Sequence, residues 1–361
     1  MPESAIDRSC GHSECQIDWL SSPRLEVDDD VVAFTKLATD AGWGDGLPLV
    51  PPTEERVRAH VAASEHYPDE VLGEIPPRGA GATVEKLAVN AVMAGAPAEA
   101  MPLLCAAVEA MTDPEFDLFA LNTTTSCVVP ALVVNGPARD ELDIPYGPGC
   151  FGGQAGPAVA IGRAIRLVMR NVGGQVVGET SKSVFGQPGR VVGMVVGEWV
   201  ERSPWPPLAE RRGVTGNAVT VHGTTGTMDV ADIVADNAGD LLRVIGGSIA
   251  YPGTNAFIGA HHGAEIMVAL APPWADLIAA DLPDLEDMQR RLWEEASLPF
   301  EAWPEPHRRA LEEKGRVGTD GRVHLVETPE HLLVVVCGGL GNLHALVLHS
   351  FGPTRAVTRA F

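Results

Sequence analysis

The sequence predicts an α/β protein with a mixed, mostly buried sheet that carries helices on its faces. Short apolar runs alternate along the chain with segments in which apolar residues recur at the spacing of a helix face. Hydrophobic residues make up 45% of the 361 residues, and Gly (39) and Pro (29) are abundant, which indicates a globule with many sharp turns. A similar succession of elements occurs twice, so we expect two pseudo-repeated halves.

The N-terminal part of the chain is predicted to be helical after a polar arm. Residues 1–30 are polar, and the acidic residues at their end suit the first turn of a helix at about 30–42. A rigid Gly- and Pro-rich loop follows, and Thr53 has the sequence context of a helix N-cap. Apolar residues at helical spacing then predict core-facing helices over 84–95 and 97–112.

Two apolar runs mark the centres of the two halves. Residues 131–134 and 266–270 each have the pattern of a strand covered on both faces, and each is followed by a Pro-containing turn and a helix. A helix at about 229–245 is expected before the second run. The succession of helix, polar loop, strand, turn and helix thus matches roughly residues 84–142 with 229–280, with chance similarity as the alternative.

The remaining elements complete the alternation. They are a helix at about 157–171, a strand at 191–196, a short strand ending at His222, a charged helical segment at 283–315, a strand hairpin around Asp320 and Gly321, and a strand at 332–336. We divide the chain into an N-terminal arm and helix (1–40), a first α/β half (41–212) and a second α/β half (213–361), packed as one globular unit.

Composition narrows the classes of partner. The formal net charge of -22 repels a phosphate backbone, and no Lys/Arg cluster offers a basic stripe, so we expect no nucleic acid. No apolar run is long enough to cross a bilayer and the N-terminus lacks the layout of a signal peptide, so we expect no membrane and a cytoplasmic location. Six cysteines are too few for a disulfide scaffold, which favours reduced thiols.

A first candidate site is the polar loop before the strand at 131–134. Asn122, Thr124 and Cys127 are candidate catalytic residues, and Thr123 and Thr125 are candidate substrate contacts, because small hydroxyls and a thiol at the end of an element can converge on a ligand. Cys127 is a nucleophile in this hypothesis, provided a cation or helix start stabilises its thiolate. The alternatives are turn hydrogen bonds and a small buried cysteine.

A second candidate is the Gly-rich loop that opens the helix at about 157–171. Its free N–H groups suit a carboxylate or phosphate, whereas the structural alternative is a tight turn that needs glycine. Arg163 follows on the same helix, where it forms either an anion clamp with Arg166 and Arg170 or surface salt bridges. The loop matches no nucleotide fingerprint, so no cofactor is expected. The candidate substrate-binding residues here are Gly149, Cys150, Gly152, Gly153, Gln154 and Arg163.

Charged and imidazole side chains supply further candidates. Asp45, Glu179 and Lys182 are candidate acid–base residues, with surface ion pairing as the alternative. His222, His261 and His262 are alternative metal ligands or bases, although a solitary histidine is more often a hydrogen-bonded scaffold residue. The Cys10–Cys15 arm with His12 lacks a second ligand cluster at zinc-finger spacing, so the leading expectation is no metal.

A set of phrases along the chain resembles a bacterial protein family. The phrases are GWGDGLPLVPPT at 42–53, GATVEKLAVNAVMAG at 81–95, VVNGP at 133–137, AIGRAIRLVMRNVGG at 160–174, GQPG at 186–189 and ERSPW at 201–205. The family is associated with small proteins that carry a Sec/Cys-Gly-Ser-Cys motif. The resemblance covers most of residues 40–361 and implies a thiol- or selenol-bearing partner, and hence cleavage or reduction of a carbon–heteroatom bond. The Cys10–Cys15 arm departs from the family pattern.

The leading functional hypothesis is an enzyme, lyase-like or thiol-assisted, that cleaves or rearranges a carbon–heteroatom bond in a small anionic metabolite. Its pocket would collect Asp45, the 122–127 loop, the 149–157 loop, Glu179 and Lys182. A second hypothesis is a non-catalytic scaffold or ligand-binding subunit for a small thiol protein, anchored by exposed Trp199 and Trp205. A third is a metal-dependent hydrolase or lyase that uses His222, His261 and His262. A homo-oligomer is expected in each case.

Overall fold

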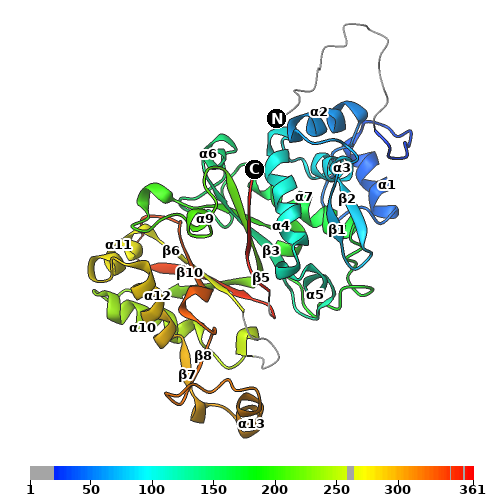
Figure 1. Ribbon diagram of the computed structural model, residues 1–361. Helices are drawn as coiled ribbons and strands as arrows, with labels where there is room; N and C mark the ends of the chain where they lie inside the picture. Colours follow the sequence, from blue (N-terminus) through cyan, green and yellow to red (C-terminus); the bar gives the residue numbers. More distant parts are fainter. Residues whose placement is uncertain (1–19, 258–263, 342, 353) are drawn as a thin grey trace, which may run out of the picture.

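The computed structural model describes residues 20–257, 264–341, 343–352 and 354–361. A strongly curled sheet lies at its centre, with helices of the first part of the chain on one side and helices α10–α12 on the other (Figure 1). The predicted α/β class, a mixed sheet with helices on its faces, is therefore confirmed.

The main sheet has seven strands. Its order is β4-β3-β5-β10-β6-β9, and β11 pairs with β5 beside the end of β10. The β3–β4 and β6–β9 pairs are parallel and the other pairs are antiparallel. The strands are β3 (Val129–Asn135), β4 (Met194–Gly197), β5 (Ala218–Ala231), β6 (Ile266–Leu270), β9 (Leu332–Val336), β10 (His344–Ser350) and β11 (Val357–Ala360); the short pairs β1 (Val71–Ile75) with β2 (Ala80–Thr83) and β7 (Ser297–Pro299) with β8 (Arg322–His324) lie outside it.

The two halves repeat one arrangement of strands. In chain order β3, β4 and β5 correspond to β6, β9 and β10, because each triplet has a central strand parallel to its second member and antiparallel to its third. A long helix precedes each central strand and a Pro-containing turn follows it. The division expected at residues 212–213 falls between α9 and β5, so it separates β5 from the triplet to which its pairing with β3 assigns it.

Helices cover both outer faces of the sheet. Thr53 caps α2 as predicted, since its Oγ1 accepts from the N–H of Arg56 at 3.4 Å. The helices are α1 (Val31–Asp40), α2 (Glu54–Ser64), α3 (Val84–Ala94), α4 (Met101–Thr112), α5 (Leu118–Thr123), α6 (Ala138–Glu141), α7 (Ala158–Asn171), α8 (Gly189–Val192), α9 (Leu208–Arg211), α10 (Ala238–Ile249), α11 (Pro272–Asp281), α12 (Leu285–Glu295) and α13 (Glu305–Glu313).

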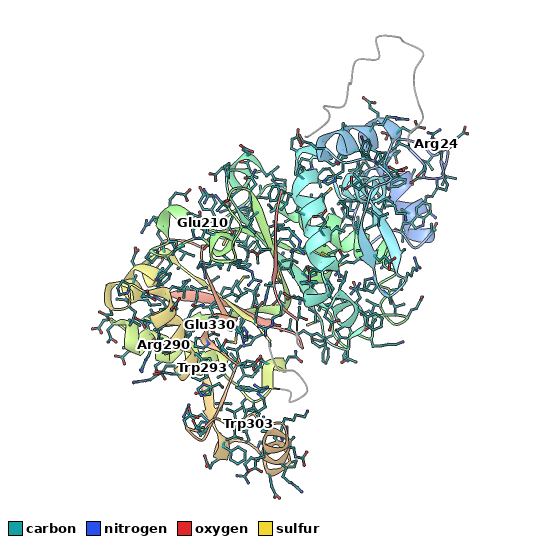
Figure 2. All side chains as sticks on the ribbon, viewed as in Figure 1. Arg24, Glu210, Arg290, Trp293, Trp303 and Glu330 are labelled. Carbon is teal, nitrogen blue, oxygen red and sulfur yellow. The ribbon has the colours of Figure 1, made fainter. Side chains whose placement is uncertain are left out.

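Alternation along the strands divides the core into three clusters. In β3, Leu132 and Val134 face α3, α4 and α7, whereas Ala131 and Val133 face the inside of the curl. The second half packs its own cluster around α10, α11 and α12. Trp303 belongs to this cluster and lies at the far end of the second half (Figure 2), where its ring packs edge-on against Phe257 at 4.9 Å.

Four local expectations are corrected by the structure. Residues 191–192 belong to α8, so the strand begins only at Met194, because the Gly-Gln-Pro-Gly turn starts a helical turn. The strand expected to end at His222 continues to Ala231 in its ladder with β10, so the helix expected from 229 begins only at Ala238. The strand after Asp320 pairs with β7 rather than with the residues just before it. Strands β10 and β11 were not predicted at all.

Candidate functional site

Three segments meet where β3 begins. The loop at 122–127 precedes the strand, the 175–190 segment lies against it, and the middle of β5 runs beside it. The Val184 N–H donates to the Thr125 carbonyl at 2.9 Å, and the Cys127 thiol donates to the Thr225 carbonyl at 3.1 Å. Gln187 Nε2 donates to the Cys127 carbonyl at 2.6 Å. We call the group formed by Cys127, Arg166, Ser181, Gln187 and Arg190 the thiol site.

Two arginines of the thiol site are held only by neutral groups. Arg166 is 7% exposed, and its guanidinium donates to the Arg190 carbonyl at 2.9 Å, to the Met169 sulfur at 2.9 Å and to Gln175 Oε1. Arg190 donates to the Ser126 carbonyl at 3.4 Å and to Ser181 Oγ at 2.9 Å. Within the described residues, neither guanidinium has a carboxylate within ion-pair distance.

The burial of these arginines changes their protonation energetics. Burial and, to a smaller extent, the charge of Arg190 lower the pKa of Arg166 to about 9. Burial also lowers the pKa of Arg190, and a negative charge on the nearby Cys127 sulfur would act in the opposite direction. Both effects disfavour the cationic forms, and a bound anion reverses them. The thiol site therefore contains two cations that lack a counterion among the described residues, although the net charge of the protein is -22.

The two arginines are brought together by a close contact between α7 and α8. A Cβ at Gly162 would lie 2.5 Å from the Val192 carbonyl oxygen, so the helices approach so closely only because that position is glycine. Gly193 ends α8 at a φ of 66°, which turns the chain directly into β4. Arg166 and Arg190 thereby share one end of the sheet with Cys127.

Asn122 and the threonines shape the loop beneath Cys127. Asn122 is fully buried, donates to the Pro76 carbonyl at 2.6 Å and accepts from Gln175 Nε2 at 3.0 Å, which links it through Gln175 to Arg166. Thr124 Oγ1 accepts from the Ser126 N–H at 3.0 Å, and Thr123 Oγ1 donates to the Phe119 carbonyl at 2.9 Å. Thr125 is exposed. These contacts position the loop.

Asp45 and Arg163, two predicted site residues, lie together but engage each other. Arg163 donates to both carboxylate oxygens of Asp45 at 2.6 and 2.8 Å and to the Pro48 carbonyl at 2.9 Å. Burial raises the pKa of Asp45. The hydrogen bonds that its carboxylate accepts from Arg163 and from the Leu47 N–H outweigh this effect, so the pKa of Asp45 is lowered. The pair fastens the 45–48 loop to α7, and any catalytic role of Asp45 stays a prediction.

Glu179 and Lys182 lie on the exposed side of the 175–190 segment. Both side chains are exposed, and Lys182 Nζ donates to the Gly178 carbonyl at 3.3 Å. They flank the thiol site without touching its arginines in the described structure. Their acid–base role stays a prediction.

The Gly-rich loop lies at the opposite end of β3. The Gly197 N–H donates to the Pro145 carbonyl beside the last residues of that seven-residue strand, and at about 3.3 Å per residue this end is roughly 20 Å from its start. Gly149, Gly152 and Gly153 have positive φ, and Gln154 donates to the Pro148 carbonyl. Cys150 is buried against Cys337. The structure thus brings the 122–127 and 175–190 segments together, but not the 149–157 loop.

The histidine and tryptophan expectations have mixed outcomes. His222 is fully buried, contacts the Leu348 carbonyl through Nε2 at 3.2 Å, and burial lowers its pKa to about 4. His261, His262 and the Cys10–Cys15 arm with His12 lie outside the described residues. Among the residues that are described, no group of three His, Cys, Asp or Glu side chains suits a metal ion. Trp205 is 5% exposed and packs in the core, so its predicted role as an exposed anchor is wrong.

Sequence reasoning missed Arg190, Gln187 and Ser181. The available signal was an arginine directly after the Gly-Gln-Pro-Gly turn, which places a cation at the entrance to a buried strand. A separate hollow of about 800 Å³ lies between the 20–27 segment, α3 and the end of α7, and its lining is mostly apolar with Lys86 and the Asn90–Asn171 pair at its polar side.

Comparisons with family models, with curated proteins and with solved structures give no match for this chain. No helix in the described part of the chain has both the length and the apolar character needed to cross a membrane.

Proposed function

We propose that the protein is an enzyme that uses Cys127 in the cleavage or rearrangement of a carbon–heteroatom bond in a small carboxylate metabolite. The observation that carries this proposal is a pair of neighbouring arginines, the buried Arg166 and the partly buried Arg190, which have no carboxylate partner among the described residues. Arg190 lies beside that thiol. A buried charge without a counterion is costly, so such a pair favours an anionic ligand.

The remaining residues of the thiol site have positioning roles in this proposal. Arg190 and Gln187 hold the carbonyls of Ser126 and Cys127, so the peptide that carries the thiol is fixed from both sides. Ser181 orients the Arg190 guanidinium, and Asn122 and Gln175 orient Arg166. A carboxylate that binds the planar guanidinium groups would present its neighbouring carbon to the Cys127 sulfur. We expect both Cys127→Ser and Arg190→Met to lower turnover of the carboxylate metabolite.

The proposal can be tested without the substrate by alkylating Cys127. Iodoacetate carries a carboxylate and iodoacetamide does not, so an anion site next to the thiol raises the rate of the first reagent relative to the second. We expect the ratio of the two rate constants at Cys127, followed by peptide mass mapping, to exceed that of free glutathione at least tenfold. Small carboxylates protect the thiol, and both Arg166→Met and Arg190→Met return the ratio to that of glutathione.

Arg170→Met provides the matched control. Arg170 lies on the same helix, but its guanidinium donates to the Gly42 carbonyl at 3.3 Å and takes no part in the thiol site. This variant keeps the native ratio. A native ratio equal to that of glutathione, or one that Arg170→Met lowers as much as Arg190→Met, contradicts the proposal.

A second candidate function is a scaffold for a small thiol protein, as the family resemblance implies. Three apolar side chains of the 175–190 segment are exposed next to the thiol site, and Phe185 is 97% exposed. The side chains are Val177, Val184 and Phe185. Phe185→Ser should weaken capture of a protein bearing a Cys-Gly-Ser-Cys motif while the alkylation ratio stays native. Turnover of a metabolite by the isolated chain contradicts the purely scaffolding function.

A further inference from the structure

Cys150 and Cys337 form a pair of thiols inside the curled sheet, away from the thiol site. Cys337 follows β9 directly, and Cys150 lies in the Gly-rich loop before α7. Their side chains are 3% and 5% exposed and belong to the same apolar cluster. The Cys337 thiol lies within hydrogen-bonding reach of the Cys150 sulfur, close enough for each thiol to shift the pKa of the other.

The surroundings of the two sulfurs differ. The backbone N–H groups of Cys150, Phe151 and Gly338 lie near the Cys150 sulfur and, together with the Cys337 thiol, act to lower the pKa of Cys150. The Cys337 hydrogen bond is the largest cause that lowers the pKa of Cys150, and the same bond, with burial, raises the pKa of Cys337. When the pair loses a proton, the negative charge is therefore favoured on Cys150 rather than on Cys337.

The two loops that carry these cysteines are fastened to each other. The Gly338 N–H donates to the Tyr146 carbonyl at 2.7 Å, and the Cys337 N–H donates to the Leu270 carbonyl at 3.1 Å. A Cβ at Gly339 would lie 3.5 Å from the Pro148 side chain, which shows how closely the loops pack. The loops that carry the two cysteines are thus held against each other.

Another buried cysteine shows what burial alone does. Cys105 lies in α4 among apolar side chains, and burial raises the pKa of its thiol to about 12. Cys150 is comparably buried, but the Cys337 thiol and neighbouring backbone N–H groups lower the pKa of its thiol. Thiolate character and donor groups make a cysteine reactive toward oxidants, whereas a cysteine like Cys105 is inert.

We propose that Cys150 and Cys337 are a redox-active dithiol that a small peroxide converts to a disulfide. The Cys150 thiolate attacks one peroxide oxygen, the O–O bond breaks, and the departing hydroxide takes a proton to become water. The resulting sulfenic acid is attacked by the Cys337 sulfur as that thiol gives up its proton. The S–S bond forms, the S–O bond breaks, and a second water leaves, so two thiols are oxidised and one peroxide is reduced to two waters.

The experiment treats the full chain with one equivalent of hydrogen peroxide and maps its peptides without reduction. We expect a cross-linked peptide pair containing Cys150 and Cys337 and the simultaneous loss of two titratable thiols. In Cys337→Ser the sulfenic acid at Cys150 persists, so labelling of Cys150 by dimedone rises at least tenfold over the native chain. Cys105→Ser, the matched buried control, behaves like the native chain.

Two outcomes overturn the proposal. One is oxidation of Cys150 to the sulfinic acid in the native chain with Cys337 still a free thiol. The other is that both thiols survive a peroxide dose that oxidises Cys127. If Cys337→Ser fails to fold, the paired loss of thiols and the cross-linked peptide in the native chain still decide the question. None of these outcomes bears on the alkylation ratio at Cys127, so this inference and the proposed function fail independently.

Discussion

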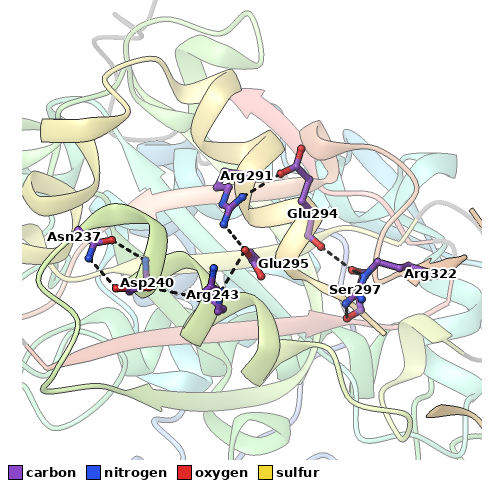
Figure 3. Close-up of polar contacts among 8 residues, drawn as sticks. All are labelled: Asn237, Asp240, Arg243, Arg291, Glu294, Glu295, Ser297 and Arg322. Atoms are coloured by element: carbon purple, nitrogen blue, oxygen red, sulfur yellow. Dashed lines mark hydrogen bonds and ion pairs between the residues drawn. The ribbon is translucent and has the colours of Figure 1, made fainter. Parts of the chain in front are cut away.

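Two arginine clusters of this protein differ in whether carboxylates pair with their guanidinium groups. Between α10 and α12, Arg243 and Arg291 both approach the carboxylate of Glu295, at 3.8 and 2.5 Å (Figure 3). Asp240 and Glu294 supply further carboxylates to the same two arginines at 3.6 Å. In the thiol site, Arg166 and Arg190 are more buried, yet among the described residues only carbonyls, a thioether, an amide and a hydroxyl contact them.

The difference separates a structural use of arginine from a functional one. The α10–α12 cluster balances its charges on an exposed surface, where such pairs contribute little to stability. The thiol site keeps cations where their desolvation is not compensated, although 48 Asp and Glu residues are available in the chain. A cluster that costs stability without an internal counterion is typical of a site that receives one from a ligand.

The largest expected effect is the loss of anion-dependent stabilisation when a thiol-site arginine is replaced. Arg166→Met removes a buried, unpaired charge, so we expect unchanged or slightly higher stability. In the native chain, an anion such as sulfate at about 100 times its Kd adds about 2.7 kcal/mol to the free energy of unfolding, and Arg166→Met loses this increment. Arg243→Met keeps it. Denaturant unfolding with and without sulfate measures both, and equal sulfate effects in the two variants would contradict the assignment.

His222 differs from the thiol-site arginines, because this buried basic side chain is neutral near pH 7. Burial lowers its pKa from 6.5 to about 4, and the nearby cationic Arg212 and His349 act in the same direction. The unfolded chain therefore binds a proton before the folded chain does, and stability present above pH 6.5 is lost as the pH falls toward 4, by up to about 3 kcal/mol.

His222→Gln should flatten this part of the pH–stability curve between pH 6.5 and 4. The control is His344→Gln, since His344 is exposed beside Asp229 at 3.1 Å. Urea unfolding at a series of pH values gives the slopes. An unchanged slope in His222→Gln would show that the acid sensitivity arises elsewhere.

The sequence predicts local elements better than it predicts the site. The strands around 131–134 and 266–270 and the cap at Thr53 are confirmed because each depends on a pattern within a few residues. Strand β10 was missed although residues 345–348 form a short apolar run, and its position depends on the ladder with β5. Local patterns carry no information on such long-range pairing.

The site depends on distances along the chain that no local pattern encodes. Asp45 and Arg163 were both identified as candidates, but their ion pair joins positions 118 residues apart. Arg166 was considered as part of a clamp with Arg163, whereas its neighbour is Arg190, and the contact exists because α7 and α8 cross at Gly162. Only the packing shows which arginines are left without carboxylates.

Gly162 offers a test of that packing. A methyl group at this position meets the Val192 carbonyl at 2.5 Å, so Gly162→Ala should separate α7 from α8 and lower the free energy of unfolding by about 1–3 kcal/mol. The control is Gly247→Ala in α10, where a Cβ has nothing within 4 Å and the helix gains about 0.5–1 kcal/mol. Equal effects of the two substitutions would contradict the close contact.

The smallest expected effect lies in the α10–α12 cluster. Glu295→Gln removes the shared carboxylate of Arg243 and Arg291, and exposed pairs of this kind contribute about 0.2–1 kcal/mol. Because the Debye length falls to about 3 Å in 1 M salt, the difference from the native chain should vanish in 1 M NaCl. Added sulfate should instead raise the free energy of unfolding of the native chain, because it supplies the missing counterion of the thiol site. If the destabilisation caused by Glu295→Gln grew with salt concentration, the two arginine clusters would respond to salt in the same way. The distinction on which the functional assignment rests would then be lost.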